Sequence, residues 1–309
     1  MTMIRQILYA TDLSPASEPA WREAQLLGRL LNAEVLVLHV VGSVTFPAEG
    51  YFPPHLYQEM VDAAHQNAHE GLNRLLEGLP EPFLKVRSRV EQGPAGQRIL
   101  AVAREEAADL IVMGTHGRTG VSRVVLGSVA DRVVRQAPCP VLTVRAPADG
   151  VPQPRRAISR ICYATDFSPA ARAAWPLALT LAEAAGAELD LVHVTPLPVP
   201  DRHLSPETIG RMAELLEEQG RIEADRFLQP SAFPRERLHV VIGRGVVGEQ
   251  IVHLAQERAA DFIVMGTHGW SGLLRWMLGS VAHHVIQVAP CPVLAVGPGG
   301  GQEERPHEA

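Results

Sequence analysis

Short apolar runs alternate with longer amphipathic stretches along the first half of the chain, and the same order returns in the second half. The runs predict strands at residues 6–10, 34–40, 84–90, 110–113 and 141–144, and the stretches between them predict helices at residues 15–31, 55–79, 96–107 and 128–136. Strands that alternate with helices are typical of a parallel sheet covered on both faces through right-handed connections. We therefore expect an α/β fold of two tandem doubly wound, Rossmann-like domains, each with a five-stranded parallel sheet flanked by helices.

Serine precedes proline at the start of the first helix in each half, at Ser14-Pro15 and at Ser168-Pro169. Serine is a favoured N-cap residue, and proline is favoured at the first helical position. We predict that Ser14 and Ser168 cap their helices.

The two halves repeat each other beyond this order of elements. The first strand ends in Ala-Thr-Asp at Asp12 and again at Asp166, and the second strand ends in His-Val at Val40 and at Val194. After the fourth strand, each half has Gly-Thr-His-Gly, then nine residues, then Gly-Ser. Repetition on this scale indicates two similar domains. We place the domains at residues 1–146 and 158–297, with a proline-containing linker at residues 147–157 and a disordered tail at residues 298–309.

Composition agrees with two folded domains and narrows the classes of partner. The chain has 309 residues, of which 46% are hydrophobic and 20% charged, and its net charge is −6 with neither half basic. Nucleic acid and anionic membranes are therefore not expected as main partners. The N-terminal residues show no signal-peptide pattern, and no apolar stretch is long enough to span a membrane. We expect a soluble, cytoplasmic protein.

Lysine and cysteine usage limits the chemistry further. Lys85 is the only lysine, and it lies in a strand-like stretch away from both glycine motifs, which weakens any mechanism that needs a lysine to hold a phosphate. Cys139 and Cys291 occupy equivalent positions in Ala-Pro-Cys-Pro-Val-Leu, and Cys162 lies in the first strand of the second half. These thiols fit small buried side chains in a reduced setting better than a disulfide framework.

The carboxyl ends of the strands are the expected ligand site, because doubly wound sheets bind ligands where the strand order reverses. Asp12 and Asp166 stand there, where they could accept hydrogen bonds from a ribose or an adenine, help to hold a metal ion, or simply begin a turn. The glycine motif follows the fourth strand, where a missing side chain allows close approach of a ligand. Its final Gly-Ser opens a helix whose free N–H groups and dipole can bind an anion. Taken alone, one such motif is also compatible with a tight turn.

Histidines near these positions have two interpretations. His116 and His268 lie inside the glycine motifs and are candidates for contact with a phosphate. His39 and His193 lie at strand ends and are better explained as structural residues with satisfied hydrogen bonds.

At these residues the chain resembles the universal stress protein family over nearly its whole length. ATP-binding members of that family carry Gly-x2-Gly-x9-Gly-Ser or Gly-Thr, and both copies here match the motif in full. The resemblance implies ATP or AMP at the carboxyl edge of each sheet and dimerisation through the final strand. In each half it places an aspartate and a valine near the adenine and the ribose. It places the residues of the glycine motif and its neighbours around the phosphates. The implied positions are Asp12, Val40, Met113, Gly114, His116, Gly117, Gly127, Ser128 and Val129 in the first half, and Asp166, Val194, Met265, Gly266, His268, Gly269, Gly279, Ser280 and Val281 in the second.

The expected function is a regulatory role in the stress response through binding of ATP, or of AMP or ADP, with Mg²⁺. No catalytic residue is predicted, because one aspartate per site and no lysine favour slow hydrolysis at best. The alternatives are a slow ATPase and a nucleotide-independent interaction module. Both motifs are complete, so the sequence favours neither half as the tighter site.

The final strands suggest how the halves associate. A tandem chain could pair residues 141–144 with residues 293–296 and form an intramolecular pseudo-dimer, which would cover two sheet edges. A homodimer of whole chains is the alternative, and no motif identifies a protein partner.

Overall fold

Each half of the chain forms five strands and four α-helices in the computed structural model, which describes residues 3–42, 54–77, 79, 85–115, 126–146, 157–196, 205–269 and 278–297. The first half contains β1 (Gln6–Thr11), α1 (Glu18–Leu31), β2 (Glu34–Val41), α2 (Pro54–Leu76), β3 (Val86–Gln92), α3 (Ala95–Glu105), β4 (Leu110–Gly114), α4 (Ser128–Gln136) and β5 (Val141–Val144). The second half contains β6 (Arg160–Ala164), α5 (Pro169–Ala185), β7 (Glu188–Thr195), α6 (Pro206–Leu228), β8 (Leu238–Arg244), α7 (Val247–Glu257), β9 (Phe262–Gly266), α8 (Ser280–Val288) and β10 (Val293–Val296). The predicted linker, except Ala157, and the predicted tail lie outside the described residues. None of the described helices is long and apolar enough to cross a membrane.

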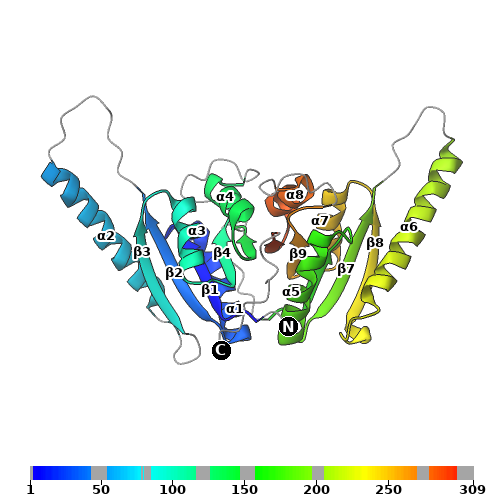
Figure 1. The fold of residues 1–309 in the computed structure, drawn as a ribbon, viewed down its shortest axis with the longest axis horizontal. Coiled ribbons are helices and arrows are strands. Elements are labelled where there is room, and N and C mark those ends of the chain that lie inside the picture. Colours follow the sequence, from blue (N-terminus) through cyan, green and yellow to red (C-terminus); the bar gives the residue numbers. More distant parts are fainter. Residues whose placement is uncertain are drawn as a thin grey trace, which may run out of the picture.

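One ten-stranded sheet runs through both halves, in the order β3-β2-β1-β4-β5-β10-β9-β6-β7-β8. Figure 1 shows β3 and β8 at its two ends. Within each half, neighbouring strands are parallel. The strand order reverses between β1 and β4 and again between β6 and β9, so each half is doubly wound as predicted. β5 and β10 join the halves as an antiparallel pair in which Val293 faces Thr143.

Helices cover both faces of this sheet. Successive residues of β1 point to opposite faces, so that Ile7 and Tyr9 belong to one core cluster while Leu8 and Ala10 belong to the other. The first cluster lies under α1, α2, α5 and α6, and the second lies under α3, α4, α7 and α8 (Figure 1). Each cluster includes residues from both halves. Burial on two faces explains why the central strands are nearly continuous apolar runs.

The two serines predicted as helix caps behave differently. Ser168 caps α5, because its Oγ accepts a hydrogen bond from the Ala171 N–H at 3.2 Å. Ser14 does not cap a helix: its Oγ donates to Asp12 Oδ1 at 2.7 Å, and a 3-10 turn at Pro15–Ser17 precedes α1. The prediction for Ser14 is therefore wrong: its Oγ accepts no capping hydrogen bond, and the chain turns through Pro15–Ser17 before α1 begins.

The three cysteines are buried and free of disulfides. Burial raises the pKa of the Cys139 thiol to about 12 and raises the pKa of the Cys162 thiol well above its ordinary value. Both thiols therefore remain protonated near neutral pH and are poor nucleophiles.

Candidate functional site

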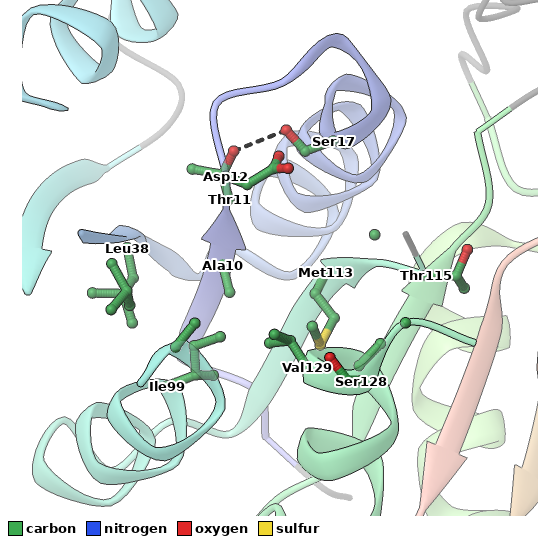
Figure 2. A pocket seen from close by; sticks show the side chains of 15 residues that line it. Ala10, Thr11, Asp12, Ser17, Leu38, Ile99, Met113, Thr115, Ser128 and Val129 are labelled. Atoms are coloured by element: carbon green, nitrogen blue, oxygen red, sulfur yellow. Dashed lines mark hydrogen bonds between the residues drawn. The ribbon is translucent and has the colours of Figure 1, made fainter. Parts of the chain in front are cut away.

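A pocket of about 200 Å³ opens at the carboxyl ends of β1, β2 and β4, at the switch point of the first half (Figure 2). The N-terminal ends of α3 and α4 complete its walls. Its lining residues come from strand ends and helix starts that are far apart in the sequence. They are Ala10, Thr11, Asp12, Ser17, Leu38, Val40, Ala95, Ile99, Met113, Gly114, Thr115, Gly127, Ser128, Val129 and Ala130.

Apolar side chains make up much of this lining. Leu38 comes from β2, Ile99 from α3 and Met113 from β4 (Figure 2). Val40 also comes from β2. Leu38 and Val40 reach the pocket together, because residues two apart on a strand point to the same face. An apolar surface with a few polar groups beside it is typical of small-molecule sites and suits a flat aromatic ring.

Polar groups come from the end of β1 and the turn that follows it. Thr11 Oγ1 and Ser17 Oγ share a hydrogen bond of 2.9 Å (Figure 2). Asp12 Oδ1 accepts hydrogen bonds from the Ser14 N–H at 3.0 Å and from Ser14 Oγ at 2.7 Å. Asp12 thus begins a turn and also lines the pocket.

The N-terminus of α4 faces the same pocket. Its N-cap residue, Gly127, is extended with φ −61° and ψ 146°, and no side chain caps the helix. The Gly127 N–H donates to the Thr115 carbonyl at 2.9 Å, which brings the two ends of the glycine motif together. Ser128, Val129 and Ala130 form the first turn and line the pocket. Their backbone N–H groups and the helix dipole make this end attractive to an anion.

Most residues predicted for the first site line this pocket: Asp12, Val40, Met113, Gly114, Gly127, Ser128 and Val129. His116 and Gly117 lie outside the described residues. Ala95 and Ile99 were missed, although their spacing places them on one face of α3 near its start. Ser17 was missed because it belongs to a 3-10 turn in a stretch predicted to be α-helix.

The second half brings the equivalent predicted residues to the corresponding strand ends. Asp166 Oδ1 accepts a hydrogen bond from the Ser168 N–H at 3.0 Å, and the Gly279 N–H donates to the Thr267 carbonyl at 2.8 Å. A Cβ atom at Gly269 would lie 2.7 Å from Asp166 Oδ2, so the backbone of the glycine motif lies against this carboxylate. Val194, Met265 and Gly266 stand at the ends of their strands, and Ser280 and Val281 open α8.

Three of the four predicted histidines fall within the described residues. His39 Nδ1 lies 2.9 Å from the Thr11 carbonyl oxygen, and His193 Nδ1 lies 2.9 Å from the Thr165 carbonyl oxygen. Both side chains therefore have the structural hydrogen bonds that were expected of them. His268 Nδ1 lies 2.8 Å from Thr267 Oγ1 in the second glycine motif.

Asp12 is the only ionisable side chain among the described residues that line the pocket. Across the described ranges, no group of three or more histidine, cysteine, aspartate and glutamate side chains is placed to hold a metal ion. A magnesium ion here would have a single protein carboxylate, and oxygen atoms of a ligand and of water would complete its coordination.

Comparisons with known proteins agree on one family. The sequence model of the universal stress protein family matches residues 3–145 and again residues 157–297. A universal stress protein of Mycolicibacterium smegmatis is 27% identical over 297 residues, which is 94% of this chain and 97% of that protein. One of Methanocaldococcus jannaschii is 36% identical over 148 residues, which is 47% of this chain and 84% of that protein.

A solved structure extends the likeness to the fold. The crystal structure of a universal stress protein from Archaeoglobus fulgidus matches with a TM-score of 0.65 at 23% identity, covering 95% of this chain and 97% of that chain. The two family matches together take in both halves, including both glycine motifs and both aspartates. The protein belongs to the universal stress protein family, with two family domains in tandem.

Proposed function

We propose that this protein binds ATP, or the related nucleotides AMP and ADP, and acts as a nucleotide-dependent regulator in the cytoplasmic stress response. One observation carries the proposal: an apolar surface, a carboxylate and an uncapped helix N-terminus meet in a single pocket at the switch point. These are the three kinds of group that an adenine, a ribose and a phosphate chain require.

The arrangement of the lining residues suggests an orientation for the nucleotide. The adenine would pack against Leu38, Val40 and Ile99, the apolar side chains of β2 and α3. Asp12 would accept hydrogen bonds from the ribose hydroxyls or from the adenine amino group. The phosphates would lie at the N-terminus of α4, where the backbone N–H groups of Ser128 and Val129 would donate to them.

The same lining argues for a protein that retains nucleotide rather than one that turns it over rapidly. Efficient phosphoryl transfer needs cationic side chains or metal ions that neutralise developing charge, together with a positioned base. Among the described lining residues no side chain is cationic, and Asp12 is the single carboxylate. Mg²⁺ would enter on the phosphates and supply charge neutralisation. A slow ATPase is the second candidate, and a nucleotide-independent interaction module is the third.

We further propose that the chain is an intramolecular pseudo-dimer. Pairing of β5 with β10 covers the edge strand that each half would otherwise expose. A symmetric homodimer built on the same strands would need these edges free, so the pairing favours association within one chain.

Nucleotide binding can be tested directly. The purified protein is denatured, and any released nucleotide is identified by chromatography and mass spectrometry; calorimetric titration with Mg·ATP and a turnover assay follow. We expect a dissociation constant in the micromolar range or lower. We expect a turnover of about 0.1 per minute. Absence of both bound nucleotide and measurable affinity would refute the proposal, and many turnovers per minute would favour the enzyme.

A glycine variant links this binding to the pocket. Gly127→Val places a branched side chain at the N-cap of α4, where it obstructs the approach of phosphates, and we expect loss of binding. Gly210→Val is the matched control, because a Cβ atom at Gly210 has nothing within 4 Å. Circular dichroism of both variants establishes that the sheet remains folded.

A further inference from the structure

We infer that the two halves are unequal nucleotide sites, the first open to the ligand and the second narrowed by its own residues, so that each chain binds one nucleotide tightly. This inference rests on the proposed nucleotide binding. The first-half pocket is the reference, and three differences separate the second half from it.

The first difference lies at the start of the first helix of each half. In the first half, the turn Pro15–Ser17 separates Asp12 from α1, and Ser17 lines the pocket. In the second half, α5 begins at Pro169, and its first turn lies against Gly266. A Cβ atom at Gly266 would be only 2.9 Å from the Ala170 carbonyl carbon and oxygen. Gly266 is accordingly buried.

The glycine that corresponds to Gly266 in the first half is Gly114, which is half-buried and lines the pocket. The fourth strand therefore ends in an accessible backbone in one half and in a covered backbone in the other. A phosphate or ribose that uses the strand end as a surface would find more exposed backbone in the first half.

The second difference lies on the opposite wall. Gly93 and Gly245 both have positive φ, at 130° and 137°, and fix the correspondence of the residues that follow them. Two positions later, the first half has Ala95, which lines the pocket, and the second half has Val247. Valine adds two methyl groups at the start of α7. At the position that Ala95 holds in the first half, these methyl groups would occupy volume that the first half leaves to a ligand.

The third difference lies on β7, at the residue that corresponds to Val40. Val40 is half-buried and lines the first pocket, whereas its counterpart Val194 is only 6% exposed. Val194 Cγ2 would lie 3.3 Å from a Cβ atom at Gly243, and Leu254 Cδ1 would lie 2.9 Å from the same atom. Close packing around Gly243 thus leaves less of this valine exposed than of Val40.

The second glycine motif adds a contact of its own. Gly269 lies so close to Asp166 that a Cβ atom would come within 2.7 Å of Asp166 Oδ2. The backbone thereby takes up one approach to the carboxylate that a ribose would use. Gly117, the counterpart of Gly269, lies outside the described residues, so this contact is an additional feature of the second half rather than a comparison.

The number of nucleotides bound per chain and the half that binds them test the inference together. Full-length protein is titrated calorimetrically with Mg·AMP-PNP, and in parallel it is photolabelled with a subsaturating amount of 8-azido-ATP and digested for peptide mapping. We expect one strong binding event per chain and label concentrated in peptides of residues 1–146. Two events of equal affinity, or label divided equally between the halves, would overturn the inequality and leave the proposed function standing. Absence of any binding would overturn both.

Exchanging alanine and valine between the equivalent positions 95 and 247 tests whether side-chain size causes the inequality. Ala95→Val is expected to weaken the strong event by about tenfold, because added methyl groups must be accommodated in a filled space. Val247→Ala is expected to strengthen binding in the second half and to raise the share of label in peptides of residues 158–297. Val246→Ala is the control, since Val246 is 63% exposed beside Val247. Unchanged affinity in Ala95→Val, with melting temperature and circular dichroism also unchanged, would contradict the steric explanation.

Discussion

Two buried tyrosines hold equivalent positions in the halves and connect β1 and β6 to the helices that follow. The Tyr9 hydroxyl donates to the Ser17 carbonyl at 2.9 Å, and the Tyr163 hydroxyl donates to the Ala171 carbonyl at 2.7 Å. Burial raises the pKa of Tyr9 to about 12 and raises the pKa of Tyr163 as well. The first strand of each half is therefore tied to the segment that follows it, which is the turn before α1 in the first half and the first turn of α5 in the second.

The raised tyrosine pKa values predict loss of stability at high pH. An unfolded tyrosine ionises near pH 10, so the unfolded state releases protons first, and the free energy of unfolding falls as pH rises from about 10 toward 12. Buried Cys139 and Cys162 act in the same direction from about pH 9. Urea denaturation across this range measures the slope, and absorbance of tyrosinate near 295 nm follows ionisation. In a Tyr9→Phe variant, the free energy of unfolding should fall less steeply with pH in this range, by about 1.4 kcal/mol per pH unit.

The stability of the Tyr9→Phe variant near neutral pH serves as the control for this prediction. At about pH 8, Tyr9→Phe should cost about 1–3 kcal/mol, because the buried Ser17 carbonyl loses its donor. An alkaline slope that is the same in the variant and in the parent protein would show that Tyr9 ionises normally.

Single residues also show where sequence reasoning works at the site. Asp12, Val40 and Gly127 were predicted because strand ends and glycine motifs can be located from apolar runs, and the structure brings them to one pocket. The cap at Ser14 does not form, because whether a serine Oγ reaches a helix N–H depends on the geometry of the turn, which the sequence alone does not define. Ala95 and Ile99 carry no polar group that would have pointed to a ligand.

At the scale of elements, strand boundaries followed apolar runs only where both faces are buried. β5 was predicted to the residue, because buried residues fill it completely. β3 was predicted at residues 84–90 and occupies Val86–Gln92. Its limits are set by its register with β2, in which Val35 faces Val86 and Val41 faces Gln92. An edge strand is half exposed, so its apolar pattern defines its ends weakly.

The outer helix α6 has one exposed and one buried glycine, Gly210 and Gly220, and substitutions at the two separate helix propensity from packing. Gly210 is exposed, and a Cβ atom there would meet nothing within 4 Å. Gly210→Ala should therefore stabilise the protein by about 0.5–1 kcal/mol, because alanine favours the helix and restricts the unfolded chain. The change in denaturation midpoint measures the effect.

Gly220 lies on the buried face of the same helix and should respond in the opposite direction. A Cβ atom there would lie 2.9 Å from His193 Cδ2. The His193 ring has little freedom to move, since its Nδ1 is hydrogen-bonded to the Thr165 carbonyl and its ring centroid lies 4.7 Å from that of Phe167. We expect Gly220→Ala to destabilise by about 1–3 kcal/mol. Equal effects at Gly210 and Gly220 would show that α6 does not pack on β7 as described.

At the scale of the whole molecule, the antiparallel pairing of β5 with β10 makes one sheet out of two domains. Leu142 faces Leu294 in this register, and Thr143 Oγ1 donates to the Val293 carbonyl at 3.2 Å. The sequence indicates such pairing only indirectly, because short buried strands at the ends of both halves can pair within a chain or between chains. Which of the two occurs depends on how the effective concentration that the linker provides compares with the concentration of a second chain.

Cutting the linker separates these possibilities. A specific protease site is inserted within residues 147–156, and the cleaved protein is compared with the intact one by sedimentation. We expect both to sediment as one 33.5 kDa particle, because the strand pair and the shared core hold the halves together without the connecting peptide. Apolar core clusters that both halves share resist dissociation, so the cleaved halves should separate only near the urea concentration that unfolds them. Separation in buffer alone, or an intact protein that sediments at twice this mass and exchanges halves with labelled copies, would show that the strands pair between chains.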